Sequence, residues 1–169
     1  YREASRLKPD RADSQFGLAA VLLTQGRWSE GWPQYEWRRK LREMGPLRGF
    51  ARPLWNGETA PDKTLFLFVE QGLGDTLQFI RFAKAARARV GRIVVEVQPA
   101  LKRLLAGIEG VDELLPQGEK IPPFDFYLPL MSLPRVLGVT VENLQAPPHY
   151  LQAEPEKIAE WREKLKPDG

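Results

Sequence analysis

Residues 64–81 read TLFLFVEQGLGDTLQFIR, and this stretch decides the expected fold. Residues 65–69 form an apolar run, which has the length of a buried strand rather than of a helix. A glycine-rich turn follows, in which Gly72 and Gly74 allow positive φ angles and a tight reversal of the chain. Asp75 then opens a helix. Its apolar side chains recur at helical spacing, at Leu77, Ile80 and Ala83.

A strand, a glycine loop and a helix in this order place polar atoms at the carboxyl end of a parallel sheet. Open α/β folds bind their ligands there, so the loop is the candidate functional site. Asp75, with Gln78 three residues later, is also typical of a capping box, which is a purely structural feature. The two roles are compatible, because an N-cap residue can also face a ligand.

Two known nucleotide-binding loops differ from this one. The dinucleotide-binding fingerprint is G-x-G-x-x-G, and Leu77 stands where its third glycine would be. The fingerprint also requires an acid that binds the ribose, about 20 residues further on at the end of the next strand. Glu96 lies close to that spacing but does not end the strand as that acid would. A Walker A loop is excluded because no Gly-Lys-Ser/Thr follows. A dinucleotide-dependent oxidoreductase is therefore a weaker alternative.

The composition bounds the class of protein. The 169 residues include 25 Lys and Arg and 22 Asp and Glu, which gives a net charge of +3. We interpret the basic cluster Arg38, Arg39, Lys40 and Arg42 as the solvated end of a helix, and we expect no nucleic-acid partner. The absence of cysteine excludes disulfides and thiolate chemistry. The single histidine, His149, follows two prolines and is more typical of a loop than of a metal site.

No apolar run reaches the ~20 residues of a membrane-spanning helix, and no signal peptide is visible. We therefore expect a cytoplasmic protein with no membrane span, no metal and no cofactor. The chain begins at Tyr1 inside a helical pattern and ends on the turn-like Pro167-Asp168-Gly169. Both ends predict a fragment of a longer protein.

Residues 1–44 have the landmarks of a helical repeat. We expect a helix over residues 14–25, a break at Gly26, and a second helix that Ser29 caps and that runs to about Arg42. Tetratricopeptide repeats have a period of about 34 residues, a glycine between the two helices and a closing proline. With Pro9 as a closing proline, that glycine falls on Gly26, so the segment resembles a tetratricopeptide repeat. The usual packing positions are then Leu18, Ala19, Leu22, Gly31 and Tyr35.

The second helix of this segment is rich in aromatic residues, namely Trp28, Trp32, Tyr35 and Trp37. Each of them can bury on the order of 150–250 Å². We interpret them as the surface that docks the repeat onto the next domain, in preference to an aromatic ligand cage. Pro33 is expected in the first turn, where a missing N–H is tolerated.

The remaining residues predict a linker and an α/β domain. Residues 45–63 hold several prolines and glycines and are expected to be a linker, with a packed turn at Trp55-Asn56-Gly57. Residues 64–169 alternate strands and helices, which indicates βαβ units and a Rossmann-like parallel sheet. Further strands are expected at 92–97, 113–115 and 124–128. Helices are expected at 99–105, at 133–137 and from Pro155 onward, where Ile158, Trp161 and Leu165 share a face.

Several motifs resemble bacterial tetratricopeptide-repeat proteins with a glycosyltransferase-like C-terminal region. The motifs are WNG at 55–57, EQGLGDTLQFIRF at 70–82, VQPAL at 97–101, FD at 124–125, LMSLP at 130–134 and PHYL at 148–151. That region is similar to heptosyltransferases and to O-linked N-acetylglucosamine transferase, which have the two-domain GT-B fold. The resemblance implies that residues 64–169 are the acceptor-side half, with the donor half absent and this fragment alone inactive.

The resemblance to heptosyltransferases also implies that Asp75 is the general base for the acceptor hydroxyl. A helix N-terminus favours the charged form of a carboxylate and so weakens it as a base. Asp75 would then orient the acceptor by hydrogen bonds instead. Arg81 would pair with an anionic acceptor or a donor phosphate, or else lie on solvated helix surface. The other candidate contacts to the substrate are Glu70, Gln71, Gly72, Gly74 and Gln78.

Two functions follow from these observations. The first is a glycosyltransferase-like protein that transfers a sugar from a nucleotide-sugar donor to a protein or glycan acceptor. The alternative is a non-catalytic tetratricopeptide-repeat scaffold for protein–protein interaction, for which Asp75 is dispensable. An uncovered domain face would also allow a homo-oligomer.

Overall fold

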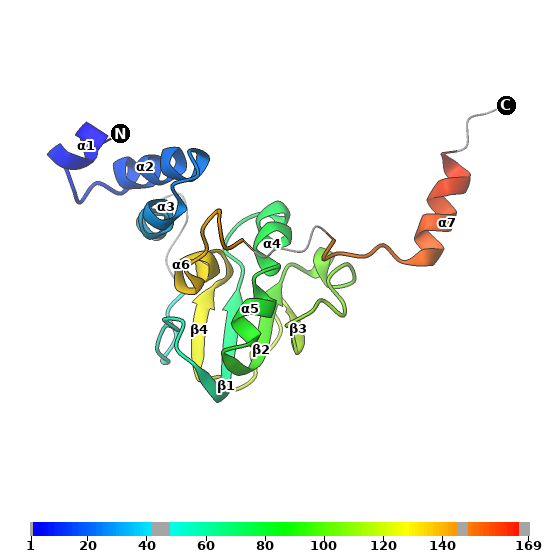
Figure 1. Cartoon of the computed structure of the whole chain (residues 1–169). Coiled ribbons are helices and arrows are strands. Elements are labelled where there is room, and N and C mark those ends of the chain that lie inside the picture. The colour runs from blue at the N-terminus through cyan, green and yellow to red at the C-terminus, as the bar shows by residue number, and fades with distance from the viewer. Residues whose placement is uncertain (1, 42–47, 145–148, 166–169) are drawn as a thin grey trace.

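The computed structural model describes residues 2–41, 48–144 and 149–165 (Figure 1). A helical segment (residues 2–41) lies above a mixed α/β unit, and a last helix projects away from both. Some sequence expectations lie outside the described residues. These concern Tyr1, Arg42, the first residues of the expected linker (45–47), Pro147, Pro148 and residues 167–169.

The helical segment contains α1 (Arg2–Leu7), α2 (Ala12–Thr24), α3 (Trp28–Tyr35) and the 3₁₀ helix η1 (Glu36–Lys40). Gly26 ends α2 with a φ of +75°, the left-handed conformation that favours glycine. Gly31 on α3 is buried against Leu23 of α2, where an added Cβ would lie 2.7 Å from a Leu23 methyl carbon. The two helices therefore approach closely because Gly31 has no side chain.

The start and the end of α3 differ from the expectation. The N-cap residue is Arg27, so Ser29 lies inside the helix and does not cap it. Pro33 also lies inside the helix rather than in its first turn. Proline removes one backbone hydrogen bond and clashes with the preceding turn. The α-helix ends at Tyr35 soon afterwards, and the chain continues as the tighter helix η1.

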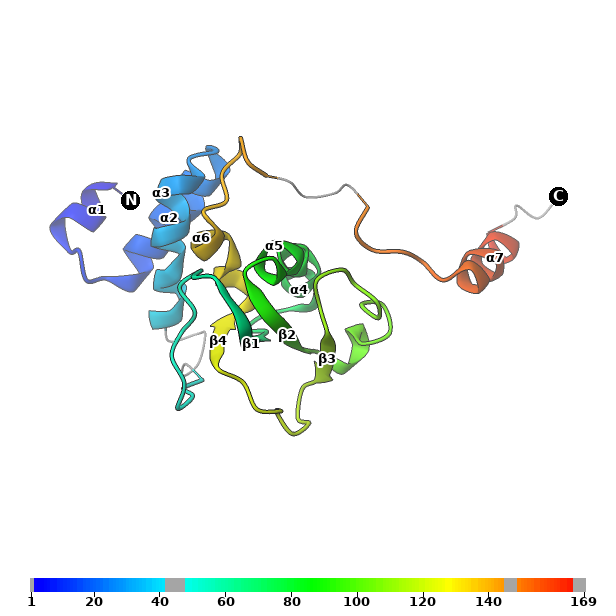
Figure 2. The ribbon, with the colours of Figure 1, turned by 60° about the horizontal axis from the view of Figure 1, so that its bottom comes forward.

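The α/β unit is built on a four-stranded, all-parallel sheet, as expected (Figure 2). Its strands are β1 (Ala60–Phe68), β2 (Val90–Val97), β3 (Glu113–Pro116) and β4 (Phe126–Pro129), in the order β3-β2-β1-β4. The first strand begins inside the expected linker, because Ala60 already donates its N–H to the Arg89 carbonyl at 2.7 Å. Gly91 permits this pairing, since a Cβ there would lie 2.0 Å from the Pro61 carbonyl oxygen.

Helices connect these strands, with boundaries that differ in part from the expectation. The single helix expected from Asp75 through Ala83 is two helices, α4 (Leu73–Ile80) and α5 (Ala83–Arg87). The helix expected at 99–105 contains the short 3₁₀ helix η3 (Pro99–Leu101), followed by turns. After β4 come the 3₁₀ helix η4 (Leu130–Ser132) and α6 (Leu133–Leu137), whose bounds agree with the prediction.

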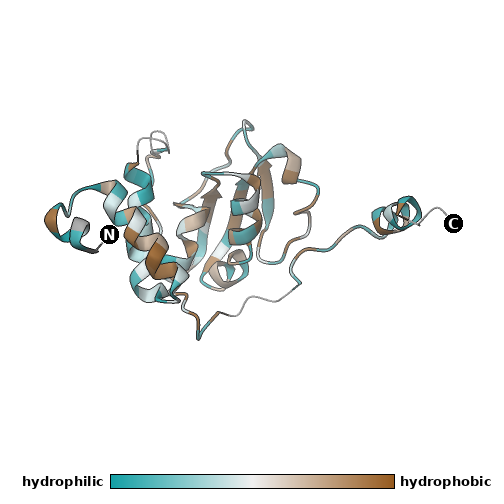
Figure 3. Ribbon diagram, turned by 90° about the horizontal axis from the view of Figure 1, so that it is seen from above, coloured by the Kyte–Doolittle hydropathy of each residue, from teal (hydrophilic) through white to brown (hydrophobic). Residues whose placement is uncertain are grey.

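The two faces of the sheet are covered differently. One face packs against α4, α5 and α6 and forms the larger core, which includes Leu65, Leu67, Ile93, Val95 and Leu128. The other face carries Phe66, Phe68 and Val94, with aromatic rings of loops packed on them. The ring centroids of Phe50 and Phe66, for example, lie 5.6 Å apart. Figure 3 shows the hydrophobic residues gathered on these strands.

The expected turn at Trp55-Asn56-Gly57 is confirmed. The Trp55 side chain is fully buried, and its Nε1 donates to the Glu58 carbonyl at 3.0 Å. Gly57 has a φ of +91°, and a Cβ there would lie 2.5 Å from the Val136 carbonyl oxygen. The turn therefore requires glycine and packs directly on α6.

The last helix, α7 (Pro155–Lys164), begins at Pro155 as expected. It lies far from the sheet at the end of an extended segment (Figures 1 and 2). Its apolar face is not covered by any described part of the chain, since Ile158 and Trp161 are 45% and 55% exposed. Among the described residues, no helix has the length and apolar character needed to cross a bilayer.

Candidate functional site

The carboxyl ends of the four parallel strands meet at one edge of the sheet, which we call the carboxyl edge. The strand order reverses between β1 and β4, which are neighbours although they are the first and last strands of the chain. In open α/β sheets, ligands bind outside the carboxyl ends of the strands at such a reversal. The residues that follow β1 and β4 therefore define the candidate site.

The glycine loop after β1 has a different geometry from the expectation. Asp75 is not the N-cap of α4 but its third residue, and the N-cap is Gly72. The Gly72 N–H donates to Asp75 Oδ2 at 3.1 Å, so the carboxylate reaches back to the helix start and Gln78 is not part of the cap. Within the described part of the chain, Asp75 Oδ1 has no hydrogen-bond partner. One oxygen of Asp75 therefore holds the start of the helix, and the other accepts no hydrogen bond from the residues that the structure describes.

The two loop glycines do not serve as left-handed hinges. Gly72 has a φ of −71°, and neither Gly72 nor Gly74 has a positive φ. Gly74 is exposed, and no atom lies within 4 Å of the position that its Cβ would take. The expectation of positive φ was wrong. Because Gly74 has no side chain, the space next to Asp75 is open.

Arg38 reaches the carboxyl edge from the helical segment. Its side chain is fully buried, which contradicts the interpretation of this basic cluster as a solvated helix end. Nη2 donates to Glu70 Oε2 at 2.6 Å and to Ser132 Oγ at 2.8 Å, and Nη1 donates to Glu36 Oε1 at 2.9 Å. Glu70 follows β1 and Ser132 follows β4, so Arg38 bridges the two strands where their order reverses.

The charges around Arg38 explain how it is buried. Burial alone would lower the pKa of Arg38, but the carboxylates of Glu70 and Glu36 outweigh it and raise the pKa above its ordinary value. The same acids act on the Tyr35 phenol, whose pKa rises to about 12. Burial is the largest cause, Arg38 opposes it, and the negative charges of Asp75, Glu70 and Glu36 add to it. Tyr35 is therefore a neutral hydrogen-bond donor near the carboxylates.

A second set of hydrogen bonds joins the glycine loop to the end of β2. The buried Thr76 hydroxyl donates to Gln98 Oε1 at 2.8 Å, and Gln98 Nε2 donates to the Gln71 carbonyl at 2.9 Å. Gln98 follows β2 directly. The loop is therefore held on one side by β2 and on the other side, through Glu70, by the helical segment.

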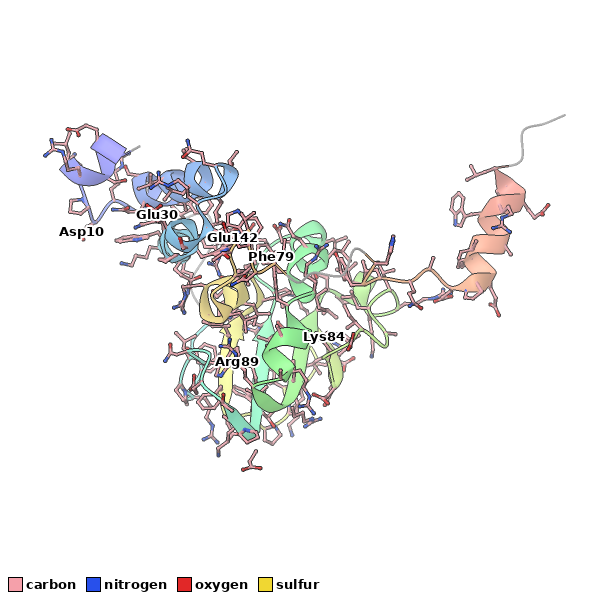
Figure 4. The ribbon with its side chains drawn as sticks, in the orientation of Figure 1. Asp10, Glu30, Phe79, Lys84, Arg89 and Glu142 are labelled. Atoms are coloured by element: carbon pink, nitrogen blue, oxygen red, sulfur yellow. The ribbon has the colours of Figure 1, made fainter. Side chains whose placement is uncertain are left out.

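Trp32 and Tyr35 dock the helical segment onto the α/β unit, which confirms the docking prediction for two of its four aromatic residues. Trp32 Nε1 donates to the Val139 carbonyl at 3.0 Å, and its ring centroid lies 6.2 Å from that of Phe79 on α4. Figure 4 labels Phe79 beside the helical segment. Trp28 instead donates to the Leu23 carbonyl within the helical segment. Trp37 lies under Lys40, 3.9 Å from its ammonium nitrogen.

The structure divides the residues predicted from the sequence into two groups. The first group lies at the carboxyl edge and consists of Glu70, Gln71, Gly72, Gly74 and Asp75. The second group is separate, because Gln78 is exposed on α4 and Arg81 is the C-cap of that helix. At 1.5 Å of rise per residue, Arg81 is roughly 9 Å from Asp75 along the helix axis. Its guanidinium lies over the Tyr150 ring at 4.2 Å.

Sequence reasoning missed four residues at this edge, namely Tyr35, Arg38, Gln98 and Ser132. Tyr35 and Arg38 adjoin the aromatic docking stripe, which was the available signal for them. Glu96, considered above as a ribose ligand, is buried in β2 and ion-paired with Arg48. No cluster of histidine and acidic side chains suited to a metal ion occurs among the described residues.

Comparisons with known proteins give one distant relative. The chain is 27% identical over 180 residues to protein FlbA of Caulobacter vibrioides, an alignment that covers 95% of this chain. It spans 30% of the length of FlbA. No protein-family model matches the chain, and no solved structure matches it.

Proposed function

We propose that the chain is the acceptor-side portion of a glycosyltransferase-like protein that uses a nucleotide-sugar donor. In this proposal the α/β unit is the Rossmann-like half of a GT-B fold, and the helical segment is the end of a tetratricopeptide-repeat array. The observation that carries the proposal is Asp75, which follows β1 at the carboxyl edge with one oxygen unpaired among the described residues.

Asp75 would act through its free oxygen. Oδ2 stays bonded to the Gly72 N–H and fixes the carboxylate, while Oδ1 accepts the proton of the acceptor hydroxyl. The hydroxyl oxygen then bonds to the anomeric carbon of the donor sugar, and the bond from that carbon to the nucleoside diphosphate breaks, so that the nucleotide leaves. The exposed Gly74 leaves room for the acceptor beside this oxygen. Tyr35 is a neutral phenol in the field of the same carboxylate and would donate a hydrogen bond to another acceptor oxygen.

The helical segment supports the repeat assignment at three positions. Gly26 makes the left-handed turn between α2 and α3, and Gly31 allows their close approach at Leu23. The small residue Ala19 is fully buried. In the resemblance to tetratricopeptide repeats, Gly26 is the glycine between the two helices, and Ala19 and Gly31 stand at packing positions.

The test measures sugar transfer from UDP-, GDP- and ADP-sugars by the full-length protein with Asp75 substituted. Asp75→Asn keeps an oxygen that can accept the Gly72 N–H, so thermal stability should change little. Transfer should fall by about 10²–10⁴-fold if the carboxylate is the base. Asp62→Asn is the matched control, because Asp62 is exposed near the other end of β1. Full transfer by Asp75→Asn would refute the assignment.

A second candidate function is a non-catalytic scaffold, and Arg38 is the observation that favours it. Arg38 is buried beyond the carboxyl ends of β1 and β4, where it bonds Ser132, and Glu70 is committed to the ion pair with it. A scaffold predicts no transfer from any of the three sugar nucleotides. It also predicts that Asp75→Asn leaves partner binding unchanged in a pull-down with the full-length protein.

A further inference from the structure

A cavity separate from the carboxyl edge lies between α5 and the C-terminal arm, which we define as residues 149–154. Its volume is about 1010 Å³, at the upper end of the roughly 300–1,000 Å³ typical of small-molecule sites. The lining includes apolar side chains from four parts of the chain: Phe82, Ala85, Leu104, Ile108, Leu137 and Leu151. The cavity can therefore hold an apolar body.

Basic side chains also line the cavity. They are Arg81, Lys84, Arg89 and His149, and among the described lining residues they face a single carboxylate, Glu109. Lys84 and Arg89 come from the α5 region, as Figure 4 shows. Arg89 donates to the Gly57 carbonyl at 2.9 Å and is committed to the fold. Lys84 is paired with Glu109 at 2.8 Å, but both side chains are more than half exposed, and such a pair is weak.

Arg81 carries an unused hydrogen-bond donor at the cavity wall, and among the described side chains with such buried atoms it is the one that lines the cavity. Its Nε is buried and has no hydrogen-bond partner among the described residues. Buried donors in native proteins are nearly always satisfied, so an unsatisfied one calls for an acceptor. Its guanidinium is held over the Tyr150 ring, and the Tyr150 hydroxyl is anchored to the Leu77 carbonyl at 2.6 Å. The arm thus fixes Arg81 at the cavity wall.

We propose that this cavity binds a small organic anion in which a carboxylate or phosphate group is attached to an apolar body. Arg81 and Lys84 hold the anionic group, and the apolar lining holds the body. An inorganic anion alone would leave the apolar surface in contact with water, and a neutral apolar molecule would leave Arg81 without an anionic partner. This site is independent of the function proposed for Asp75.

Calorimetric titration of the full-length protein with decanoate tests the proposal. Decanoate should bind with one site per chain, whereas the neutral decanol should bind at least tenfold more weakly, because it cannot pair with the cations. Inorganic phosphate, which lacks the apolar body, should show no measurable binding. Equal affinity for decanoate and decanol, or no binding of decanoate at all, would overturn the proposal.

Substitutions then locate the site. Ala85→Phe fills the cavity from the exposed side of α5 and should abolish decanoate binding, whereas Ala100→Phe, which is exposed outside the cavity, should not. Ala88→Phe repeats the test at another exposed lining position if Ala85→Phe lowers the melting temperature. Unchanged binding in a folded cavity-filling variant would place the ligand elsewhere and refute the assignment.

Removal of charge completes the experiment. Arg81→Gln and Lys84→Gln should each weaken decanoate binding by about tenfold and leave decanol unaffected. Lys102→Gln is the matched control, since Lys102 is exposed and does not line the cavity. Equal losses in all three variants would indicate a general effect of net charge and would contradict a specific anion site.

Discussion

The helical segment and α7 flank the α/β unit at opposite ends of the chain, and only one of them is docked. Both carry apolar residues at helical spacing, and each has a tryptophan among them. Trp32 of α3 contacts α4 and bonds the Val139 carbonyl, whereas Trp161 of α7 is 55% exposed. The contrast shows that an amphipathic pattern tells which face of a helix can be buried. It does not tell whether a surface is present to bury it.

Long-range polar contacts account for the difference. Arg38 ties the helical segment to Glu70 and Ser132, which are 32 and 94 residues away in the sequence. Ion pairs within α7, as between Glu160 and Lys164 at 2.7 Å, do not leave the helix, and its N-cap residue Glu154 pairs with an exposed arginine, Arg103. Internal pairs of this kind stabilise a helix by about 0.2–0.5 kcal/mol each, but they attach it to nothing.

Removal of the Arg38 charge should have the largest effect on stability. Arg38→Met leaves Glu70 without its cation, while Glu36 keeps weaker pairs with Arg39 and Arg135 at 3.6 and 3.8 Å. Breaking a buried ion pair costs about 3–5 kcal/mol. We expect the lower end of that range, because the side chains of Glu36 and Glu70 remain 18% and 12% exposed. Urea unfolding followed by circular dichroism measures the change.

Arg103→Met is the matched control for that measurement. Arg103 forms an ion pair with Glu154 at the base of α7, but its side chain is 68% exposed. Exposed pairs contribute about 0–1 kcal/mol. Similar losses of stability in the two arginine variants would remove the basis for treating Arg38 as the anchor of the helical segment.

Trp32→Phe should have an intermediate effect. The substitution removes the hydrogen bond to Val139 and part of the contact with Phe79, which together are worth about 1–2 kcal/mol. Trp161→Phe on α7 should change the free energy of unfolding by less than about 0.5 kcal/mol. The two variants, compared in one urea titration series, sharpen the contrast between docked and undocked aromatic residues.

Tyr35 should make the folded state sensitive to alkaline pH. The pKa of Tyr35 is about 12 in the folded chain and 10.0 ordinarily. The stability that this difference provides is therefore complete below pH 10. Between pH 10 and 12 the unfolded chain loses the phenol proton first, so stability falls by at most about 1.4 kcal/mol per pH unit. Tyr35→Phe should reduce this slope while leaving stability at pH 8 nearly unchanged. An identical slope in both proteins would contradict the burial of the phenol.

The smallest effect is expected within α7. Glu160→Gln removes the ion pairs with Lys157 and Lys164, which should lower the helicity of α7 slightly. The global free energy of unfolding should not change, because α7 buries no residue. A measurable loss of global stability would show that α7 is docked in solution.

Much of the architecture could be predicted from local patterns. The parallel sheet follows from the apolar run that ends at Phe68 and from the alternation of strands with short helices. The packed turn at Gly57 and the bounds of α6 also follow from local sequence. The start of β1 could not be predicted, because Pro61 is typical of a linker and the pairing there depends on the distant Gly91.

The candidate site could be predicted only in part. Glu70 and Asp75 lie at the carboxyl edge because a glycine loop after a buried strand must end there. Arg38 was interpreted as solvated, because its neighbours are basic and its partners Glu70 and Ser132 are distant in sequence. The position of Asp75 within the cap could not be settled, since a cap at Gly72 and a cap at Asp75 fit the same residues.

Hydrogen exchange at increasing urea concentrations tests most directly the claim that Arg38 joins the helical segment to the carboxyl edge. Peptides from α3, from α4 and from α7 report the opening free energy of each region. We expect α3 and α4 to exchange with the same opening free energy and α7 to exchange with almost no protection. In Arg38→Met, α3 should lose protection before α4. An opening free energy of α3 well below that of α4 in the unsubstituted protein would contradict the account.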